Sequence, residues 1–297
     1  MKRKYLLSIC LFFIIAFIFS SFETPYNRHP NNYCVSGDSF RSYCDFAYDE
    51  LDRSLDPSSV KPGNVIFVKT DFLGEFFQKI HPKINSKYII VSHNSDYGAP
   101  GNFKAYLDDE KLVAWFAQNV DGYVHKKLHP IPIGIANKMW PHGNEELIKK
   151  YMKGNFKREY FLYNNFKECT YFERIYVNEL FKDLPYCHSS GLKDYENYLK
   201  DVASSFFILT PRGNGVDTHR IWEAFYLGSV AIVKTSSLDT LYADLPVIIV
   251  KDWKEVNEEF LKAKFLEMEN KHFLYEKLDI KYWHKLIDSY KSLCVEK

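Results

Sequence analysis

The chain has 297 residues, of which 46% are hydrophobic and 26% charged, enough apolar material for one large domain or two modest ones. An aromatic content of 17% excludes a disordered chain, and a net charge of +1 gives no electrostatic reason to expect a nucleic-acid partner.

The chain begins with a basic cluster, Lys2, Arg3 and Lys4, followed by an uncharged run over residues 5–22. As a helix this run spans about 27 Å, close to the roughly 30 Å hydrocarbon core of a bilayer. Because basic clusters stay on the cytosolic side, the remainder is expected to be translocated to a Golgi- or ER-like lumen or to the cell exterior. We predict that residues 1–22 are a single-pass membrane anchor. A cleaved signal peptide, which would give a secreted protein, is the alternative.

Six cysteines are present, one of them inside the apolar run. Cys34 and Cys44 are close in sequence and can form a disulfide in an oxidising compartment, or can be free, buried residues. No C-x-x-C pair occurs, so a zinc site is not expected.

Residues 23–62 are rich in Pro, Asn, Ser, Asp and Tyr and predict a stem with little regular structure. Residues 63–153 follow as an N-terminal α/β domain. Its expected elements, in chain order, are a strand at 64–68, a helix at 73–80, a strand at 87–91, a helix or strand at 112–118, an extended segment at 129–134 and a helix at 145–152.

Residues 154–297 form the second predicted α/β domain. Its expected strands are 159–163, 205–209, 229–233 and 246–250, and its expected helices are 171–181, 195–203, 218–227, 238–242 and 256–268. Strands that alternate with helices imply a parallel sheet with right-handed crossovers. The predicted fold class is therefore α/β, with two Rossmann-like domains facing a cleft.

One predicted strand–loop–helix unit, residues 206–228, carries the candidate site. Gly213 and Gly215 allow close backbone approach to a ligand, and the loop ends at a helix N-terminus, which favours an anion. Arg212 and Arg220 flank it, and arginine binds phosphate bidentately. Glu223 shares the helix face of Arg220 and can accept hydrogen bonds from sugar hydroxyls. Arg220 and Glu223 can also be an ordinary helix ion pair, worth about 0.3–0.5 kcal/mol. The combination favours a diphosphate pocket.

The runs "LTPRGNGVDTHRIWEAFYLGSVAIV" and "LDTLYADLPVIIVKDW" resemble the nucleotide-sugar domain of exostosin-like glycosyltransferases, family 47. A weaker resemblance covers "YIIVSHNSDYGAP" and "PIPIGIANKMWPHGN". The resemblance implies a GT-B fold and inverting, metal-independent transfer from a UDP-sugar to a glycan or glycoprotein acceptor, with no cofactor beyond that donor substrate. It leaves the acceptor open, and also the sugar, which can be a hexosyl, pentosyl or glucuronosyl group.

The absence of a D-x-D motif agrees with metal independence, because enzymes that bridge donor phosphates through Mg²⁺ or Mn²⁺ need clustered carboxylates. The nearest cluster, residues 108–110, is expected to be a solvated face. The leaving diphosphate would then be stabilised by Arg212, Arg220, loop N–H groups and the helix dipole. The expected donor-binding residues are Arg212, Gly213, Asn214, Gly215, Asp217, His219, Arg220 and Glu223.

The catalytic base is expected on the other domain, facing the donor across the cleft. Asp96 and His93 follow a predicted strand end and are the candidates, with loop capping as the alternative role. Trp140 and His142 are the candidate acceptor-binding residues. Trp140 can stack on a sugar or pack at a hinge. Residues 252–253 match the family's terminal Asp-Trp pair, where we expect packing.

Three other classes of protein are alternatives: a non-catalytic protein, an epimerase or dehydrogenase, and a hydrolase. A non-catalytic glycan-binding or scaffold protein would retain the same fold without turnover, but the intact Arg-x-x-Glu segment favours an enzyme. An epimerase or dehydrogenase would carry G-x-G-x-x-G after its first strand, and a hydrolase G-x-S-x-G. Neither motif occurs.

Overall fold

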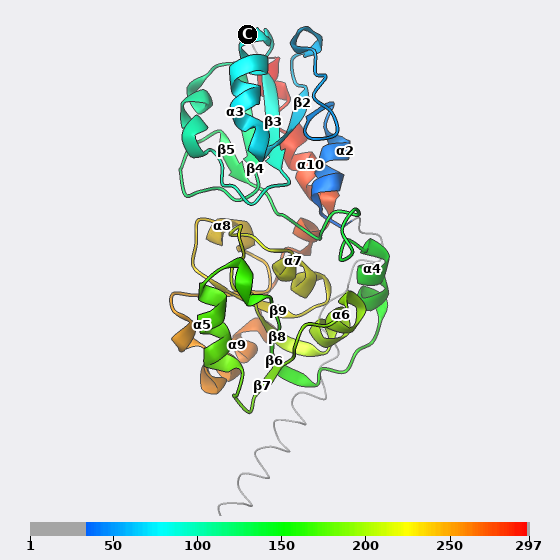
Figure 1. Cartoon of the computed structure of the whole chain (residues 1–297), viewed down its shortest axis with the longest axis vertical. Coiled ribbons are helices and arrows are strands. Elements are labelled where there is room, and N and C mark those ends of the chain that lie inside the picture. The colour runs from blue at the N-terminus through cyan, green and yellow to red at the C-terminus, as the bar shows by residue number, and fades with distance from the viewer. Residues whose placement is uncertain (1–33, 296–297) are drawn as a thin grey trace, which may run out of the picture.

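The computed structural model describes residues 34–295, which form two five-stranded, fully parallel sheets (Figure 1). The strand orders are β1-β2-β3-β4-β5 and β10-β9-β8-β6-β7. Helices join the strands of each sheet, so the chain is an α/β protein with two Rossmann-like units, as the alternation of the sequence predicts.

The first unit contains the first sheet. Its elements are α2 (Gly37–Tyr43), β1 (Phe46–Tyr48), β2 (Val65–Lys69), α3 (Leu73–Glu75), β3 (Tyr88–His93), β4 (Leu112–Ala117) and β5 (Leu128–Pro130). Every residue of β3 is buried, as expected for a central parallel strand with both faces covered. The segment 112–118, for which a helix and a strand were both considered, is the strand β4. The helix expected over 73–80 is α3 followed by a π-helical turn, Phe76–Ile80.

Residues 34–62, expected to be part of a stem or entry region with little regular structure, contain α2 and β1. Ser36 caps α2 by accepting a hydrogen bond from the Ser39 N–H, and Phe40 of the same helix is buried. β1 extends the sheet beside β2, with Phe46 opposite Ile66. Both elements are short and flanked by polar residues, so their periodicity is weak in the sequence.

The second unit contains the other sheet. Its elements are β6 (Tyr160–Asn164), α5 (Glu173–Phe181), β7 (Cys187–Ser189), α6 (Tyr195–Ala203), β8 (Ser205–Leu209), α7 (His219–Tyr226), β9 (Val230–Lys234), α8 (Asp239–Tyr242), β10 (Val247–Val250) and α9 (Glu258–Glu269). The chain runs from β7, on one side of β6, to β8, on the other. This reversal of strand order is where ligands bind in open α/β sheets. Trp253 is buried and packs as expected, whereas Asp252 is exposed and caps a short 3-10 turn.

Two helices connect the units. α4 (Glu145–Lys153) lies in the chain between β5 and β6, and α10 (Ile280–Asp288) returns the chain to the first unit, where it lies beside α2 (Figure 1). Tyr43 stacks on His284 at 4.0 Å, and Tyr290 meets Phe116 edge-on at 5.5 Å. The sequence assigns these last residues to the second domain, but their contacts are with the first.

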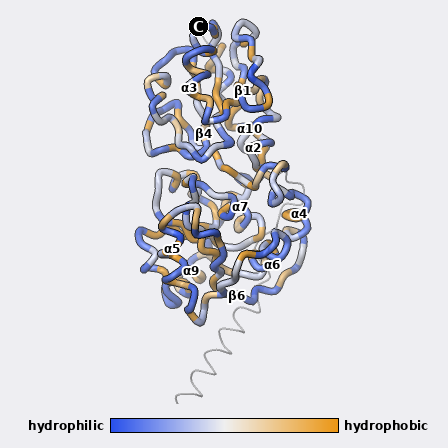
Figure 2. The backbone as a smooth tube through the Cα atoms, in the orientation of Figure 1, coloured by the Kyte–Doolittle hydropathy of each residue, from blue (hydrophilic) through white to orange (hydrophobic). Residues whose placement is uncertain are grey.

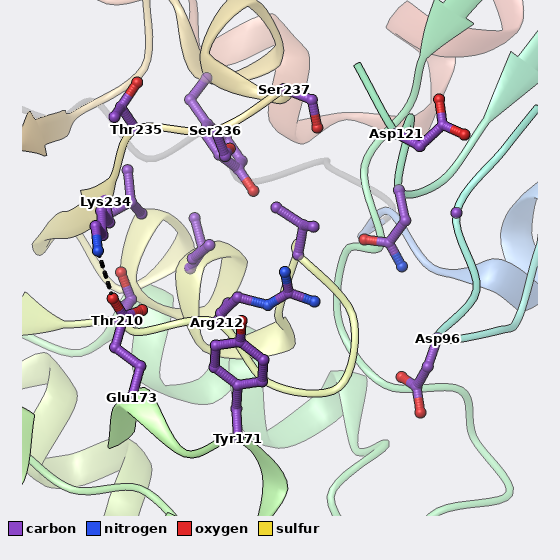
Figure 3. Close-up of a pocket in the computed structure, with 16 residues that line it drawn as sticks. Asp96, Asp121, Tyr171, Glu173, Thr210, Arg212, Lys234, Thr235, Ser236 and Ser237 are labelled. Atoms are coloured by element: carbon purple, nitrogen blue, oxygen red, sulfur yellow. Dashed lines mark hydrogen bonds and ion pairs between the residues drawn. The ribbon is translucent and has the colours of Figure 1, made fainter. Parts of the chain in front are cut away.

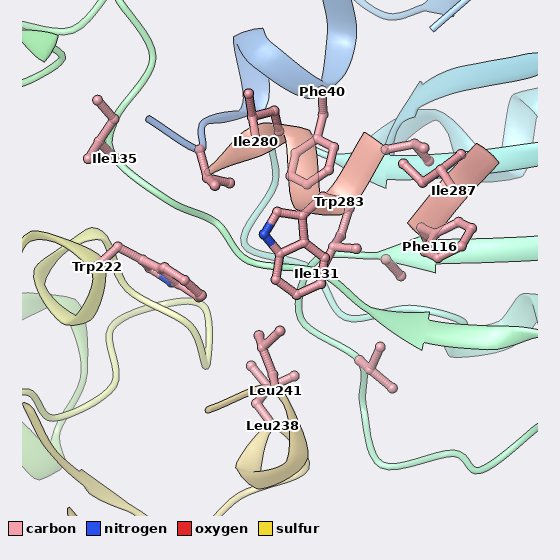
Figure 4. Packing of buried hydrophobic residues seen from close by; sticks show 14 of the residues in the cluster. Phe40, Phe116, Ile131, Ile135, Trp222, Leu238, Leu241, Ile280, Trp283 and Ile287 are labelled. Carbon is pink, nitrogen blue, oxygen red and sulfur yellow. The ribbon is translucent and has the colours of Figure 1, made fainter. Parts of the chain in front are cut away.

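Hydrophobic segments gather inside each unit (Figure 2), and one buried cluster runs across both. In it Phe40, Ile280 and Trp283 lie on the side of the first unit, and Trp222 and Leu241 on the side of the second (Figure 4). The two units therefore share part of one hydrophobic core.

The five cysteines within residues 34–295 are free, so Cys34 and Cys44 are not joined here. Within the same residues no helix is long and apolar enough to cross a membrane. The predicted anchor or signal segment, residues 1–22, lies outside the described part of the chain.

Candidate active site

A cavity of about 570 Å³ lies between the two units and is lined by both (Figure 3). Thr210 and Lys234, at the carboxyl ends of β8 and β9, line it from the second unit. Asp96 and Asn119, which follow β3 and β4, line it from the first. Ligands of open α/β sheets bind beyond the carboxyl ends of strands, so this cavity has the expected position for a substrate.

The loop between β8 and α7, residues 210–218, touches the first unit directly. The Asn214 side-chain amide donates to an Asp96 carboxylate oxygen at 3.2 Å, and the Asp217 N–H donates to Asn119 Oδ1 at 2.9 Å. A Cβ at Gly215 would lie 2.7 Å from Asn119 Nδ2. Glycine at 215 is therefore required by the approach of the other unit.

Arg212 extends from this loop toward the side of the cavity that carries Asp96 (Figure 3). Its guanidinium lies over the Tyr171 ring, 4.3 Å from the centroid, and Nη2 donates to the Asn214 carbonyl oxygen at 2.9 Å. The only acceptors that the structure gives its guanidinium are backbone carbonyls, so its charge has no carboxylate partner among the described residues.

Arg220 lies in the first turn of α7, with its guanidinium 4.9 Å from the centroid of the Tyr198 ring. Its Nε and Nη1 atoms are buried and have no hydrogen-bond partner within residues 34–295. The ion pair with Glu223 considered above is not formed. Instead the hydroxyls of Tyr195 and Tyr198 each donate to a Glu223 oxygen at 2.9 Å.

A second buried arginine, Arg174 of α5, lies near Arg220 and was not identified from the sequence. It is 6% exposed and donates to the carbonyl oxygens of Arg212 at 2.8 Å, Lys167 at 3.0 Å and Pro211 at 3.2 Å. Burial and the neighbouring Arg220 charge lower the pKa of Arg174 to about 10. Two cations held together without a counter-ion favour binding of an anion.

Three of the predicted donor residues face inward. Asp217 accepts hydrogen bonds from the Ile133 N–H at 2.7 Å, Trp222 Nε1 at 2.9 Å and the Tyr242 hydroxyl at 2.9 Å, and burial raises its pKa to about 6. His219 Nδ1 donates to the Gly134 carbonyl oxygen at 2.8 Å, and burial lowers its pKa. Glu223 is 4% exposed. These side chains hold α7 against its neighbours.

The two candidate bases have different surroundings. His93 is 1% exposed. Its Nε2 donates to the Pro132 carbonyl oxygen at 3.0 Å, its Nδ1 accepts the Asn94 N–H at 2.7 Å, and burial lowers its pKa to about 4. Both ring nitrogens are engaged, so His93 caps its loop and does not reach the cavity. Asp96 is exposed and lines the cavity.

Trp140 and His142 lie outside the lining of this cavity. Trp140 is 53% exposed and stacks on His142, with ring centroids 6.3 Å apart. The His142 ring lies 6.0 Å from that of His219 and 6.2 Å from that of Tyr195. They therefore form an exposed aromatic surface near the N-terminus of α7.

Within residues 34–295, no three His, Cys, Asp or Glu side chains lie close enough together to hold a metal ion. Asp109, in the acidic segment 108–110, contacts His81 Nε2 at 3.2 Å, and the Asp108 side chain is 82% exposed.

No protein-family model matches this sequence, and no curated protein is significantly similar to it. Among solved structures, the chain is similar to a chain of the GtfA/B complex, with a TM-score of 0.40 and 10% identity, covering 78% of this chain and 58% of that one. It is similar to the pneumococcal O-GlcNAc transferase GtfA in complex with UDP and GlcNAc, with a TM-score of 0.38 and 11% identity, covering 78% of this chain and 58% of that one. It is also similar to the UDP-GlcNAc 2-epimerase of Methanocaldococcus jannaschii, with a TM-score of 0.38 and 13% identity, covering 77% of each chain. Because these TM-scores lie below 0.5, function is inferred here from the residues of the site.

Proposed function

We propose that this protein is a glycosyltransferase of the GT-B type that transfers a sugar from a UDP-sugar to a glycan or glycoprotein acceptor, with inversion and without a metal ion. The observation that carries the proposal is the Arg220 guanidinium beside Arg174 at a helix N-terminus, with Nε and Nη1 buried and without a partner in the described part of the chain. The resemblance of residues 209–253 to exostosin-like enzymes agrees with it and supplies the UDP-sugar as the expected donor.

In this proposal the donor diphosphate binds Arg220, Arg212 and the N–H groups of the loop, while the sugar occupies the 570 Å³ cavity. Asp96 accepts the proton of an acceptor hydroxyl, whose oxygen attacks the anomeric carbon. The bond from that carbon to the diphosphate breaks, and the diphosphate leaves with the electron pair. The arginines and the helix dipole stabilise the developing negative charge.

The exposed surface of Trp140 and His142 is proposed to bind the acceptor, because an aromatic ring offers an apolar face to a sugar. Residues 1–22 are proposed to hold the enzyme to the membrane, with its active site on the lumenal or extracytoplasmic side. An enzyme so held would meet acceptors that are displayed at that surface.

The test is calorimetric titration of the full-length protein with UDP, with and without EDTA, beside Arg220→Met and the control Arg53→Met. Arg53 is an arginine of the first unit with a 46% exposed side chain. We expect UDP binding that survives EDTA, is lost in Arg220→Met and persists in Arg53→Met. Among UDP-sugars, one should be consumed in an acceptor-dependent reaction whose kcat falls at least a hundredfold in Asp96→Asn.

Different failures would have different meanings. Binding of another nucleoside diphosphate in place of UDP would refute the UDP donor and retain the transferase. A folded protein that binds no nucleoside diphosphate and turns over no nucleotide sugar would refute the transferase. A non-catalytic, glycan-binding protein would then be the remaining interpretation.

A further inference from the structure

A second cavity, of about 450 Å³, opens at the carboxyl ends of β6 and β7 in the second unit. Its walls are of two kinds. Phe166 and the 70% exposed Leu192 are apolar, whereas Asn165, Asn178 and Ser190 present amide and hydroxyl groups. Small-molecule sites commonly combine apolar walls with a few convergent polar groups and have volumes of roughly 300–1,000 Å³.

Asn165 fixes one wall of this cavity. It is 7% exposed, and its side-chain amide nitrogen donates to Ser190 Oγ at 2.9 Å and to the Gly191 carbonyl oxygen at 2.8 Å. The segment after β7 is thus held beside the end of β6. The polar edge of the cavity is ordered before any ligand arrives, which lowers the entropic cost of binding.

Arg174 lies between this cavity and the loop of residues 210–218. On the cavity side, its guanidinium lies over Phe166, 5.5 Å from the ring centroid, and Nη1 donates to the Lys167 carbonyl oxygen. On the other side, Nε donates to the Arg212 carbonyl oxygen. Arg174, whose charge neighbours that of Arg220, therefore backs this cavity.

The 570 Å³ cavity lies at the carboxyl ends of β8 and β9, further along the same edge of the sheet. Arg212 lines the 570 Å³ cavity, and so does Glu173, which is the chain neighbour of Arg174. Along the carboxyl-end edge of the second sheet the 450 Å³ cavity comes first, then Arg174 and Arg212, and then the 570 Å³ cavity. A nucleotide sugar has the same order of parts: a heterocyclic base on ribose, a diphosphate and a sugar.

We propose that the 450 Å³ cavity binds the nucleobase of the donor, with Phe166 and Leu192 against the ring faces and the side chains of Asn165, Asn178 and Ser190 at its polar edge. This inference rests on the proposed function, since it assigns the base end of the same donor. It also assigns base selection to the segments 164–169 and 190–192, which lie outside the strand–loop–helix unit that binds the diphosphate.

Cys169 provides a direct probe, because it is exposed and lines this cavity. Full-length protein is alkylated with iodoacetamide in the presence of UDP, uridine or inorganic pyrophosphate, and labelling of Cys169 is followed by peptide mass spectrometry. At ten times its Kd a ligand occupies about nine-tenths of the protein, so UDP and uridine should each slow labelling about tenfold. Pyrophosphate should leave the rate within about twofold.

A complementary experiment blocks the cavity and uses Cys169→Ser as the matched control. After treatment with N-ethylmaleimide, wild-type protein should lose at least tenfold in affinity for UDP while keeping its affinity for pyrophosphate. Treated Cys169→Ser should keep both affinities, because its remaining cysteines react as they do in the wild type.

The outcomes separate the two proposals. If calorimetry shows UDP bound but Cys169 is labelled at an unchanged rate, the base binds elsewhere, and the nucleobase assignment is overturned while the donor proposal stands. Equal protection by pyrophosphate and UDP would overturn it as well, since the anion alone would then account for the effect. If another nucleoside diphosphate binds in place of UDP, that nucleotide and its nucleoside become the probes, with the same expected results. If no nucleoside diphosphate binds, both proposals fall.

Discussion

Replacement of Arg220 by methionine tests whether the arginine pair is a ligand site or a structural feature. Among residues 34–295, Arg220 Nε and Nη1 are buried and have no hydrogen-bond partner, and Arg174 places a second positive charge nearby. A buried polar group without a hydrogen bond costs about 1–3 kcal/mol. The contact of the guanidinium with Tyr198 returns about 0.5–2 kcal/mol, and a methionine sulfur retains part of it.

These terms predict that Arg220→Met changes the free energy of unfolding by between about 0 and +2 kcal/mol, in the stabilising direction. Arg174→Met is the contrasting variant. It removes the donors to three backbone carbonyls, of Lys167, Pro211 and Arg212, and should destabilise the protein by about 2–4 kcal/mol. The two substitutions make the same chemical change within one cluster, yet opposite effects are expected.

The assay is urea unfolding of both variants with and without nucleotide. At a concentration of one hundred times Kd, UDP should stabilise the wild-type protein by about 2.7 kcal/mol, and this increment should vanish in Arg220→Met. A loss of more than about 1 kcal/mol of stability in ligand-free Arg220→Met would refute the reasoning, because Arg220 would then hold the fold together.

Three further results are expected. Gly215→Ala should destabilise the protein by about 1–3 kcal/mol, since the added Cβ would lie 2.7 Å from Asn119 Nδ2. The control is Gly191→Ala, which has nothing within 4 Å of its Cβ and should leave stability unchanged in the same urea titration. Glu223→Gln should cost about 1–3 kcal/mol, because an amide cannot accept from two tyrosine hydroxyls through two oxygens, and chemical denaturation measures the loss. Asp217 has its pKa raised to about 6 in the fold, above its usual value near 4, so its contribution to stability should grow as the pH falls from 7 toward 4. Thermal unfolding across that range should show the trend in wild-type protein and a smaller one in Asp217→Asn, and equal trends would contradict it.

Elements with a clear apolar period or run were predictable from the sequence alone. The bounds expected for α6 and β8 are those of the structure, because α6 has apolar residues at helical spacing and β8 is an apolar run of which four of five residues are buried. β7 was missed, since it has only three residues, none of them fully buried. α10 was missed although Ile280, Trp283 and Ile287 stand at helical spacing. What no local pattern records is its partner, α2, more than two hundred residues earlier in the chain.

The candidate site was partly predictable, for a related reason. The strand–loop–helix pattern located Arg212 and Arg220, but residue type does not give side-chain direction, so His93 and Asp217 were expected at the ligand although both are buried in hydrogen bonds. Arg174 lies outside any glycine-containing motif. The sequence does carry one signal for it: Arg174 precedes Val177 and Phe181 at helical spacing, which places an arginine on the apolar face of a predicted helix.

Arg220 and Glu223 do not form an ion pair with each other, and this arrangement favours an anionic ligand. Three residues apart on one helix, they are placed to neutralise each other, and such a pair would leave little positive charge for a ligand. Tyr198 prevents this, because its ring lies under the Arg220 guanidinium while its hydroxyl donates to Glu223. The carboxylate is thus satisfied by two neutral donors, and the charge of the arginine is left without a partner in the described chain. An anion that binds there gains a desolvated, uncompensated cation, which is the arrangement expected where a diphosphate must be both held and released as a leaving group.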